Sequence, residues 1–308
     1  MTEILCIYNP QAGGGKSKDH LEEIKSYFKK YNINADIVFT EHPQHSIEIV
    51  EKADLSKYSG IAIAGGDGSF FNALNGYMKR ADSPSIPMGI LPVGTGNSLS
   101  RDIASLDSTL EDFVRIISEG NTMGLDLAEV KSKDETFYYA NMMGFGFIND
   151  VVETASKLKF FKSFAYTLGV LYNTIKLNTF DLKMTVDGEE LNLDNVFVII
   201  SNSKYTGGNY LIAPKAEIND GKLDLIILNR LSRLNLLKIF PMIFDGSHVD
   251  TKFVDYIHAK NIKLEAKIPK ILAPDGEIYG EFPAEISCIP AGIRVFASQS
   301  RQTGERKK

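Results

Sequence analysis

The strongest constraint on this 308-residue chain is a pattern that occurs three times within its first 125 or so residues. A short apolar run is followed by a glycine-rich loop, and the loop by a helical pattern. The loops are "NPQAGGGKS" (9–17), "GGDGS" (65–69) and "GTGNS" (94–98). A fourth apolar run, 35–39, lacks such a loop. Short strands that are apolar on both faces and alternate with helices predict a parallel sheet covered on both sides.

The pattern changes after residue 126, where short β-rich segments are separated by Gly, Asn and Asp turns. That spacing predicts an antiparallel sandwich or barrel. Two helical patterns interrupt it, at 162–177 and 233–244. We therefore expect an α/β N-terminal domain over 1–126, a second, β-rich domain over 127–289 and a polar, disordered tail over 298–308.

Composition excludes several classes of protein. The net charge is −5, and no basic block dominates, so nucleic acid is not expected as a partner. No apolar run approaches the roughly 18 residues of a transmembrane helix. The N-terminus lacks the regions of a signal peptide, and two cysteines within apolar runs are typical of a reducing compartment. We expect a cytoplasmic protein.

The three glycine loops point to a phosphate ligand. Loops of this kind lie at the carboxyl edge of a doubly wound sheet, where ligands bind, and N–H groups at helix starts favour phosphate. The sequence therefore predicts a nucleotide or phosphate site. A P-loop remains a minor alternative, because its pattern needs glycine where Pro10 stands. The dinucleotide fingerprint fails at Leu99, which replaces its third glycine.

Several segments in this order resemble the diacylglycerol-kinase-type catalytic domain family of bacterial lipid kinases and sphingoid-base and ceramide kinases. They are "IYNPQAGGGK", "GGDGSFFNALNG", "LPVGTGN", "GGNYLIAPKAEINDGKLDLIIL" and "PDGEIYGEFPAEISCIPAGIRVF". The resemblance implies an ATP-binding α/β domain and a lipid-substrate β-sandwich domain, with the active site between them. It also implies that a last segment, about 290–300, returns to the first domain.

The same resemblance implies a set of nucleotide-binding residues. These are Asn9, Pro10, Gln11, Ala12, Gly13, Thr40, Gly65, Gly66, Asp67, Gly68, Ser69, Phe70, Phe71 and Thr95. The Asp67 carboxylate cannot usefully face a phosphate without a cation between them, so Mg²⁺ is implied along with ATP. The sequence departs from the family pattern at Phe71, Asn72 and Ser98, where the family usually has Asn, Glu and Asp.

Two Asp-Gly-Glu triplets compete for the role of catalytic base. Residues 187–189 lie between alternating patterns and predict a type I′ hairpin turn. Residues 275–277 could form the same kind of turn. The resemblance implies instead that Glu277 accepts the proton of the attacking hydroxyl, with Asp275 as an alternative base or as an orienting, metal-linked group.

A second metal site is implied by "EINDGKL" (217–223), which resembles the structural Mg²⁺ loop of bacterial members. There the ligands would be the Asp220 side chain and the carbonyls of Glu217 and Lys222. A simple turn between two strands remains open as the alternative. Asp126 matches a family aspartate near the domain junction, and a structural role is equally expected for it.

These observations predict a peripherally membrane-acting lipid kinase that transfers the γ-phosphate of ATP to a lipid hydroxyl. Diacylglycerol or a related glycerolipid is the first choice, and a sphingoid base the second. A soluble-metabolite kinase with the GGDG loop and an inactive regulator remain alternatives, the latter because of Phe71 and Asn72. The expected partner is a lipid at a membrane surface, and a homodimer is possible. The helical pattern over 160–177 could line an acyl-chain groove or dock on a membrane surface, although packing on the sandwich is preferred.

Overall fold

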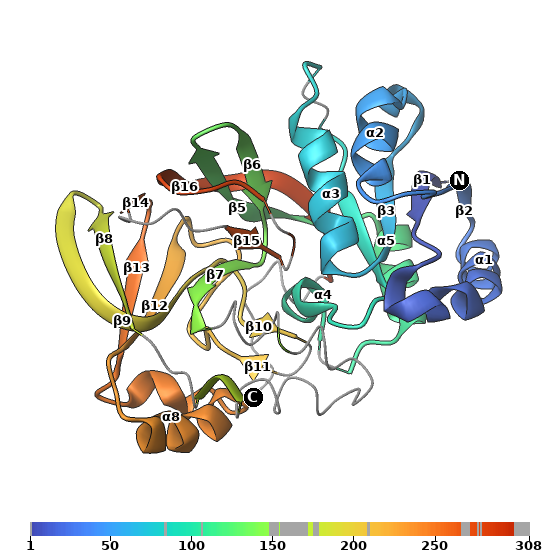
Figure 1. Cartoon of the computed structure of the whole chain (residues 1–308). Coiled ribbons are helices and arrows are strands. Elements are labelled where there is room, and N and C mark those ends of the chain that lie inside the picture. The colour runs from blue at the N-terminus through green and yellow to red at the C-terminus, as the bar shows by residue number, and fades with distance from the viewer. Residues whose placement is uncertain are drawn as a thin grey trace.

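The structure is a computed structural model, and Figure 1 shows its course. It describes residues 2–82, 85–105, 107–147, 154, 172–174, 179–207, 210–265, 272–275, 277 and 279–298. None of the helices in these ranges has the length and apolar character needed to span a bilayer.

Four parallel strands form the N-terminal sheet. They are β1 (Thr2–Tyr8), β2 (Ile33–Phe39), β3 (Gly60–Gly65) and β4 (Met88–Pro92), in the order β2-β1-β3-β4. The chain order reverses between β1 and β3, and such a reversal is where open α/β sheets bind ligands. The loops after β1 and β3 therefore begin at the binding edge.

Helices cover both faces of this sheet, as the sequence predicts. The helical elements are η1 (Ala12–His20), α1 (Leu21–Lys30), α2 (His45–Lys52), η2 (Leu55–Lys57), α3 (Asp67–Met78), α4 (Ser98–Ile103) and α5 (Leu110–Glu119). Successive β1 side chains point to opposite faces. Ile4 and Cys6 pack with α1 and α5, whereas Leu5 and Ile7 pack with α2 and α3.

The C-terminal half is built from antiparallel strands. The long ones are β5 (Thr122–Ser132), β6 (Thr136–Tyr139), β7 (Met142–Gly146), β8 (Phe180–Val186), β9 (Glu189–Ser201), β12 (Leu223–Asn229), β13 (Val254–Ala259), β14 (Asn261–Glu265) and β16 (Ala284–Phe296). The short ones are β10 (Tyr205–Thr206), β11 (Tyr210–Leu211) and β15 (Ala273–Pro274). Helix α8 (Arg233–Ile239) continues into η4 (Phe240–Ile243), and η5 (Ser247–Asp250) follows.

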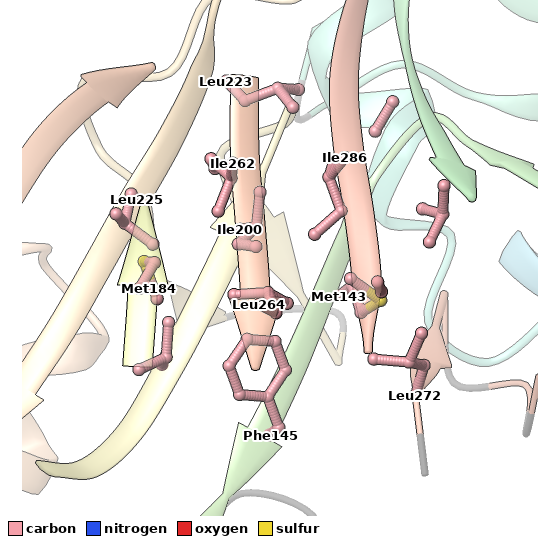
Figure 2. Close-up of a cluster of buried hydrophobic side chains, with 14 of the residues drawn as sticks. Met143, Phe145, Met184, Ile200, Leu223, Leu225, Ile262, Leu264, Leu272 and Ile286 are labelled. Carbon is pink, nitrogen blue, oxygen red and sulfur yellow. The ribbon is translucent and has the colours of Figure 1, made fainter. Parts of the chain in front are cut away.

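The core of this half lies between its strand layers. Figure 2 shows side chains from several strands, among them Met143, Met184, Ile200 and Ile262, directed toward one another. The alternation that predicts strands places one residue in two in this interior. An antiparallel β-sandwich on a parallel α/β domain is the fold class expected from the sequence, and it is confirmed.

Two long strands connect the halves. β5 pairs antiparallel with β16 over nearly its whole length, and Val295 of β16 pairs in parallel with Met88 of β4. Residue 126, the expected boundary, lies inside β5. The division into 1–126, 127–289 and a returning segment stays a prediction, and the strands on which it depends run through both halves.

The turn and helices expected from the sequence can be compared with the turns and helices of the structure. The Asp187–Gly188 turn between β8 and β9 is confirmed, and both residues have positive φ, 46° and 93°. The helix expected over 233–244 forms as α8 and η4. The pattern over 160–177, apart from 172–174, and the tail beyond residue 298 lie outside the described residues.

Candidate active site

A cavity of about 560 Å³ lies at the carboxyl ends of the parallel strands. Its walls come from the loops after all four strands and from the Asp275–Glu277 segment of the other half. The lining residues are Asn9, Gln11, Ala12, Gly13, Thr40, Glu41, His42, Pro43, Gln44, Ser46, Gly66, Asp67, Gly68, Ser69, Asn72, Gly94, Thr95, Gly96, Asp275 and Glu277. Ten of the fourteen expected nucleotide residues and both expected catalytic acids are among them.

The loops are joined to one another by polar side chains. Asn9 Nδ2 donates to Ser69 Oγ at 2.9 Å, which connects the loop after β1 to α3. Asn97 Nδ2 donates to the Gly94 carbonyl at 2.9 Å, and its Oδ1 accepts from the Gly94 N–H at 3.1 Å. Close approach explains the glycine at 94, because a Cβ there would overlap Cα of Gly66.

Asp67 joins the GGDG loop to α4. Its carboxylate accepts from the Ser98 N–H at 2.8 and 3.0 Å and from the Leu99 N–H at 3.3 Å. These are first N–H groups of α4, which lack partners within the helix. Asp67 therefore acts as an N-terminal cap supplied by another loop, while its side chain also borders the cavity.

Glu277 lies directly against the GGDG loop. A Cβ placed on Gly68 would overlap Oε1 of Glu277, so a larger residue there would displace the carboxylate from its present position. Burial raises the pKa of Glu277 above its ordinary value. A raised pKa makes a carboxylate a stronger base once it is ionised, which is what proton transfer from a hydroxyl requires.

Asp275 is held by main-chain groups. Its Oδ1 accepts from the Met142 N–H at 3.0 Å, and its own N–H donates to the Met142 carbonyl at 2.9 Å. It adopts a left-handed backbone with φ of 50°. Burial, and then the charge of Asp67, raise the pKa of Asp275, while main-chain N–H groups of residues 140–142 oppose the rise. Because these bonds fix the carboxylate, they favour an orienting role for Asp275 over the role of catalytic base.

The charge of the cavity bears on its ligand. Its described lining contains four carboxylates, Glu41, Asp67, Asp275 and Glu277, and neither lysine nor arginine. Arg101 of α4, close to the loop after β4, lies over the Tyr205 ring at 5.5 Å. No group of three or more His, Cys, Asp or Glu side chains within the described ranges could hold a metal alone. Because the lining is acidic, a polyphosphate could bind in this cavity only together with a cation. The phosphate oxygens would then be ligands of that cation, and Mg²⁺ prefers oxygen ligands.

Four of the residues expected to bind nucleotide do not line the cavity: Pro10, Gly65, Phe70 and Phe71. The Phe71 side chain is fully buried. Its ring packs against Tyr279 at 5.4 Å and Phe137 at 6.4 Å between ring centroids. The departure from the family pattern at this position thus places an aromatic side chain against the segment that carries Glu277.

One wall of the cavity was missed by the sequence analysis. Apart from Thr40, the loop after β2 contributes Glu41, His42, Pro43 and Gln44, and the first turn of α2 contributes Ser46. The rings of His42 and His45 stack at 4.4 Å. The topological rule could have indicated this wall, because β2 ends at the same edge as β1 and β3. Asn72 was also missed as a site residue, whereas Gly94 and Gly96 belong to a glycine loop that was expected at the phosphate site.

The expected metal loop lies outside the cavity lining, beside the point where the register of the β5–β16 pair shifts. Asp220 Oδ1 accepts from the Lys222 N–H at 3.0 Å. Asp126 is buried and accepts from the N–H groups of Gly221 at 2.6 Å and Ala291 at 2.7 Å. The charge of Asp220 contributes to a raised pKa of Asp126, after burial. A Mg²⁺ ion held by Asp220 and the carbonyls of Glu217 and Lys222 would reduce this repulsion, so the donor set fits.

Comparison with known proteins gives two family matches that together span nearly the whole chain. Residues 3–130 match the diacylglycerol kinase catalytic domain. Residues 141–297, just over half of the chain, match the YegS C-terminal NAD kinase beta sandwich-like domain.

Similar curated proteins carry two kinds of name. Diacylglycerol kinase of Mycobacterium tuberculosis is 26% identical, over 96% of this chain and 94% of that protein. Diacylglycerol kinase of Bacillus subtilis is 25% identical, over 98% of each. Sphingosine kinase 1 of Arabidopsis thaliana is 26% identical, over 96% of this chain and 72% of that protein.

Solved structures share the fold. A diacylglycerol kinase from Bacillus anthracis has a TM-score of 0.73 at 19% identity, over 97% of this chain and 98% of that one. A second crystal structure from the same organism has a TM-score of 0.79 at 22% identity, with the same coverage.

Proposed function

Because the chain belongs to the lipid kinase family with a diacylglycerol kinase catalytic domain, we propose that it transfers the γ-phosphate of ATP to the hydroxyl of diacylglycerol or a related glycerolipid. The observation that carries this proposal is the position of Glu277. A half-buried carboxylate with a raised pKa faces the glycine loop at which a nucleotide would bind.

Each group in the proposed site has one role. The loops after β1, β3 and β4 bind the phosphates through main-chain N–H groups, and Thr40 and Thr95 add hydroxyls. Magnesium, bound together with the nucleotide, supplies the positive charge that the lining lacks. Glu277 accepts the proton of the lipid hydroxyl while the hydroxyl oxygen bonds to the γ-phosphorus. The bond from the γ-phosphorus to ADP breaks, and ADP leaves. Asp275 orients the segment through Met142.

A glycerolipid is preferred over a sphingoid base because the chain matches diacylglycerol kinases over more of their length than the sphingosine kinase. The alignments cover 94% and 98% of two diacylglycerol kinases but 72% of the Arabidopsis sphingosine kinase. Sphingosine is the second candidate, since that kinase is equally similar in sequence. Both substrates carry a primary hydroxyl that Glu277 could deprotonate.

The test is transfer of label from γ-labelled ATP, with Mg²⁺, to diacylglycerol or sphingosine in detergent micelles. We expect labelled phosphatidic acid from the wild-type protein. Glu277→Gln should lower kcat by about a hundredfold or more, because general base catalysis typically contributes that much. ATP binding, measured by calorimetry, should stay within a few-fold. Faster labelling of sphingosine would overturn the substrate assignment, and unchanged kcat in the variant would remove Glu277 as the base.

A further inference from the structure

Exposed apolar side chains gather on one short segment of the C-terminal half. Among the described residues, five large hydrophobic side chains are substantially exposed, and three of them lie between positions 234 and 244. They are Leu234, 72% exposed, Leu237, 37%, and Phe244, 51%. Figure 1 shows α8 at one end of the molecule, beyond β12 and β13. A concentration of this kind marks an interaction site more often than isolated exposed residues do.

Helix α8 is apolar on two faces. Leu236 and Ile239 are buried and pack into the core beneath. Leu234 and Leu237 of α8, Pro241 of η4 and Phe244 directly after it are all exposed, and they form the outer side of the segment. A surface helix normally has a single apolar face, so the outer one needs a partner. We call this outer face the α8 surface: Arg233, Leu234, Leu237, Lys238, Pro241 and Phe244.

The charge of the segment indicates the partner. Residues 230–244 contain Arg230, Arg233 and Lys238 and no acidic residue, although the whole chain has a net charge of −5. Arg230 pairs with Asp194 at 2.9 Å, whereas Arg233 and Lys238 are exposed beside the leucines. Apolar side chains flanked by cations match the boundary between acyl chains and anionic headgroups.

A second copy of the chain fits this face less well. In a two-fold symmetric dimer the same patch faces itself, so Arg233 and Lys238 would face the same two cations of the second copy across the interface. That arrangement brings like charges together over a small apolar area. An anionic membrane presents the opposite charge and needs no matching pocket.

The α8 surface is connected to the cavity by packed elements. The Phe244 ring lies 5.0 Å from that of Tyr210 in β11, and β11 pairs with β10. The N–H of Lys204, next to β10, donates to Asp102 of α4 at 3.0 Å. Helix α4 begins at the loop that lines the cavity, where Asp67 caps it. The surface thus belongs to the same packed unit as the loop after β4.

We propose that the α8 surface docks the protein on anionic membranes, with Leu234, Leu237 and Phe244 entering the interface and Arg233 and Lys238 contacting lipid phosphates. The proposal deepens the function proposed above and rests on it, since a kinase of membrane lipids must work at that surface. It assigns the site of attachment.

The experiment compares binding of the full chain to vesicles of phosphatidylcholine with and without phosphatidylglycerol, by flotation. One variant combines Arg233→Glu and Lys238→Glu, and a second combines Leu234→Ser and Phe244→Ser. The matched control combines Lys25→Glu and Lys29→Glu on α1, which changes the net charge equally. All six side chains lie at the surface, and circular dichroism checks that each variant folds. Labelling of diacylglycerol is measured in the same vesicles and in uncharged detergent micelles.

We expect the wild-type protein to bind the anionic vesicles. Binding should fall at least about twentyfold in the charge variant, at about fivefold per cation, and at least about tenfold in the apolar variant. The control should bind like the wild type. In the charge variant and the apolar variant, labelling of diacylglycerol should fall in vesicles and stay unchanged in micelles. If wild-type protein binds in this way but labels lipid in neither presentation, the proposed function fails and the docking surface stands. The docking surface would be overturned if all variants bound vesicles equally or if the wild type did not bind. It would also be overturned if the apolar variant dissociated a dimer without losing vesicle binding.

Discussion

Glu277 and Asp275 belong to one triplet but differ in what surrounds them. Main-chain groups of β7 hold Asp275, whereas Glu277 lies against a glycine and borders the cavity. Their pKa values are raised by burial, and that of Asp275 also by the charge of Asp67. The two acids can therefore be separated by experiment.

The pH dependence of the reaction should report Glu277. The base must be ionised, and burial raises its pKa, so the ionised fraction falls as the pH drops through that raised value. We expect kcat/KM to decline on the acid side at a pH above about 4.3, the ordinary value for glutamate. The measurement is a pH profile of kcat/KM with micellar substrate. A profile that stays flat down to that value would contradict the assignment.

Gly68→Ala tests the contact between the two halves of the site. The added methyl group would overlap the Glu277 carboxylate and displace it from the loop. We expect kcat to fall at least about tenfold, because small displacements of a catalytic group are costly. The midpoint of thermal unfolding should change little, since the overlapping atom is the end of a flexible side chain and alanine has a higher helix propensity than glycine. Ser26→Ala, at an exposed position of α1 outside the cavity lining, is the control for activity. Unchanged kcat in Gly68→Ala would show that the contact is not needed.

At the scale of elements, the loops depend on one another. Asp67, the first residue of α3, caps α4, and Asn9 after β1 holds Ser69 of α3. Asn75 in the same helix exchanges hydrogen bonds with Tyr138 of β6, at 2.9 Å in both directions. Helix α3 thus connects the glycine loops to the β-sandwich.

Asp67→Ala should loosen the start of α4. The variant removes the acceptor for the N–H groups of Ser98 and Leu99, a loss of about 1–2 kcal/mol for a helix cap. We expect a lower unfolding midpoint in urea and a several-fold higher KM for ATP. Asp67→Asn keeps one acceptor oxygen and should lose less on both counts. If KM for ATP is unchanged in Asp67→Ala, the cap has no part in nucleotide binding.

Some of this arrangement is predictable from sequence, and the reasons differ by element. Apolar runs and glycine loops predict the parallel sheet and its ligand edge, because both depend on local spacing. The interior position of Phe71 is not predictable in that way, since its partner Tyr279 lies about 200 residues later. The wall formed by residues 41–46 lacks a glycine signature, and only the strand order places it at the cavity.

At the scale of the whole molecule, the loop 217–222 offers a test for a structural ion. If Asp220 holds Mg²⁺ there, saturating Mg²⁺ should stabilise the nucleotide-free protein by about 1–3 kcal/mol. Thermal unfolding with Mg²⁺ and with a chelator measures this effect, which Asp220→Asn should abolish. Asp107→Asn, at an exposed position, should keep it. Equal stabilisation of Asp220→Asn and wild type would place the ion elsewhere.

The long pair of β5 and β16 limits how the two halves can move. A continuous ladder resists bending, and this one is interrupted only where its register shifts between Ile289 and Ile293. Asp126 lies opposite that interruption and binds the Ala291 N–H. Any hinge rotation that opened or closed the cavity would concentrate at this bulge, where the two hydrogen bonds of Asp126 to Gly221 and Ala291 would oppose it.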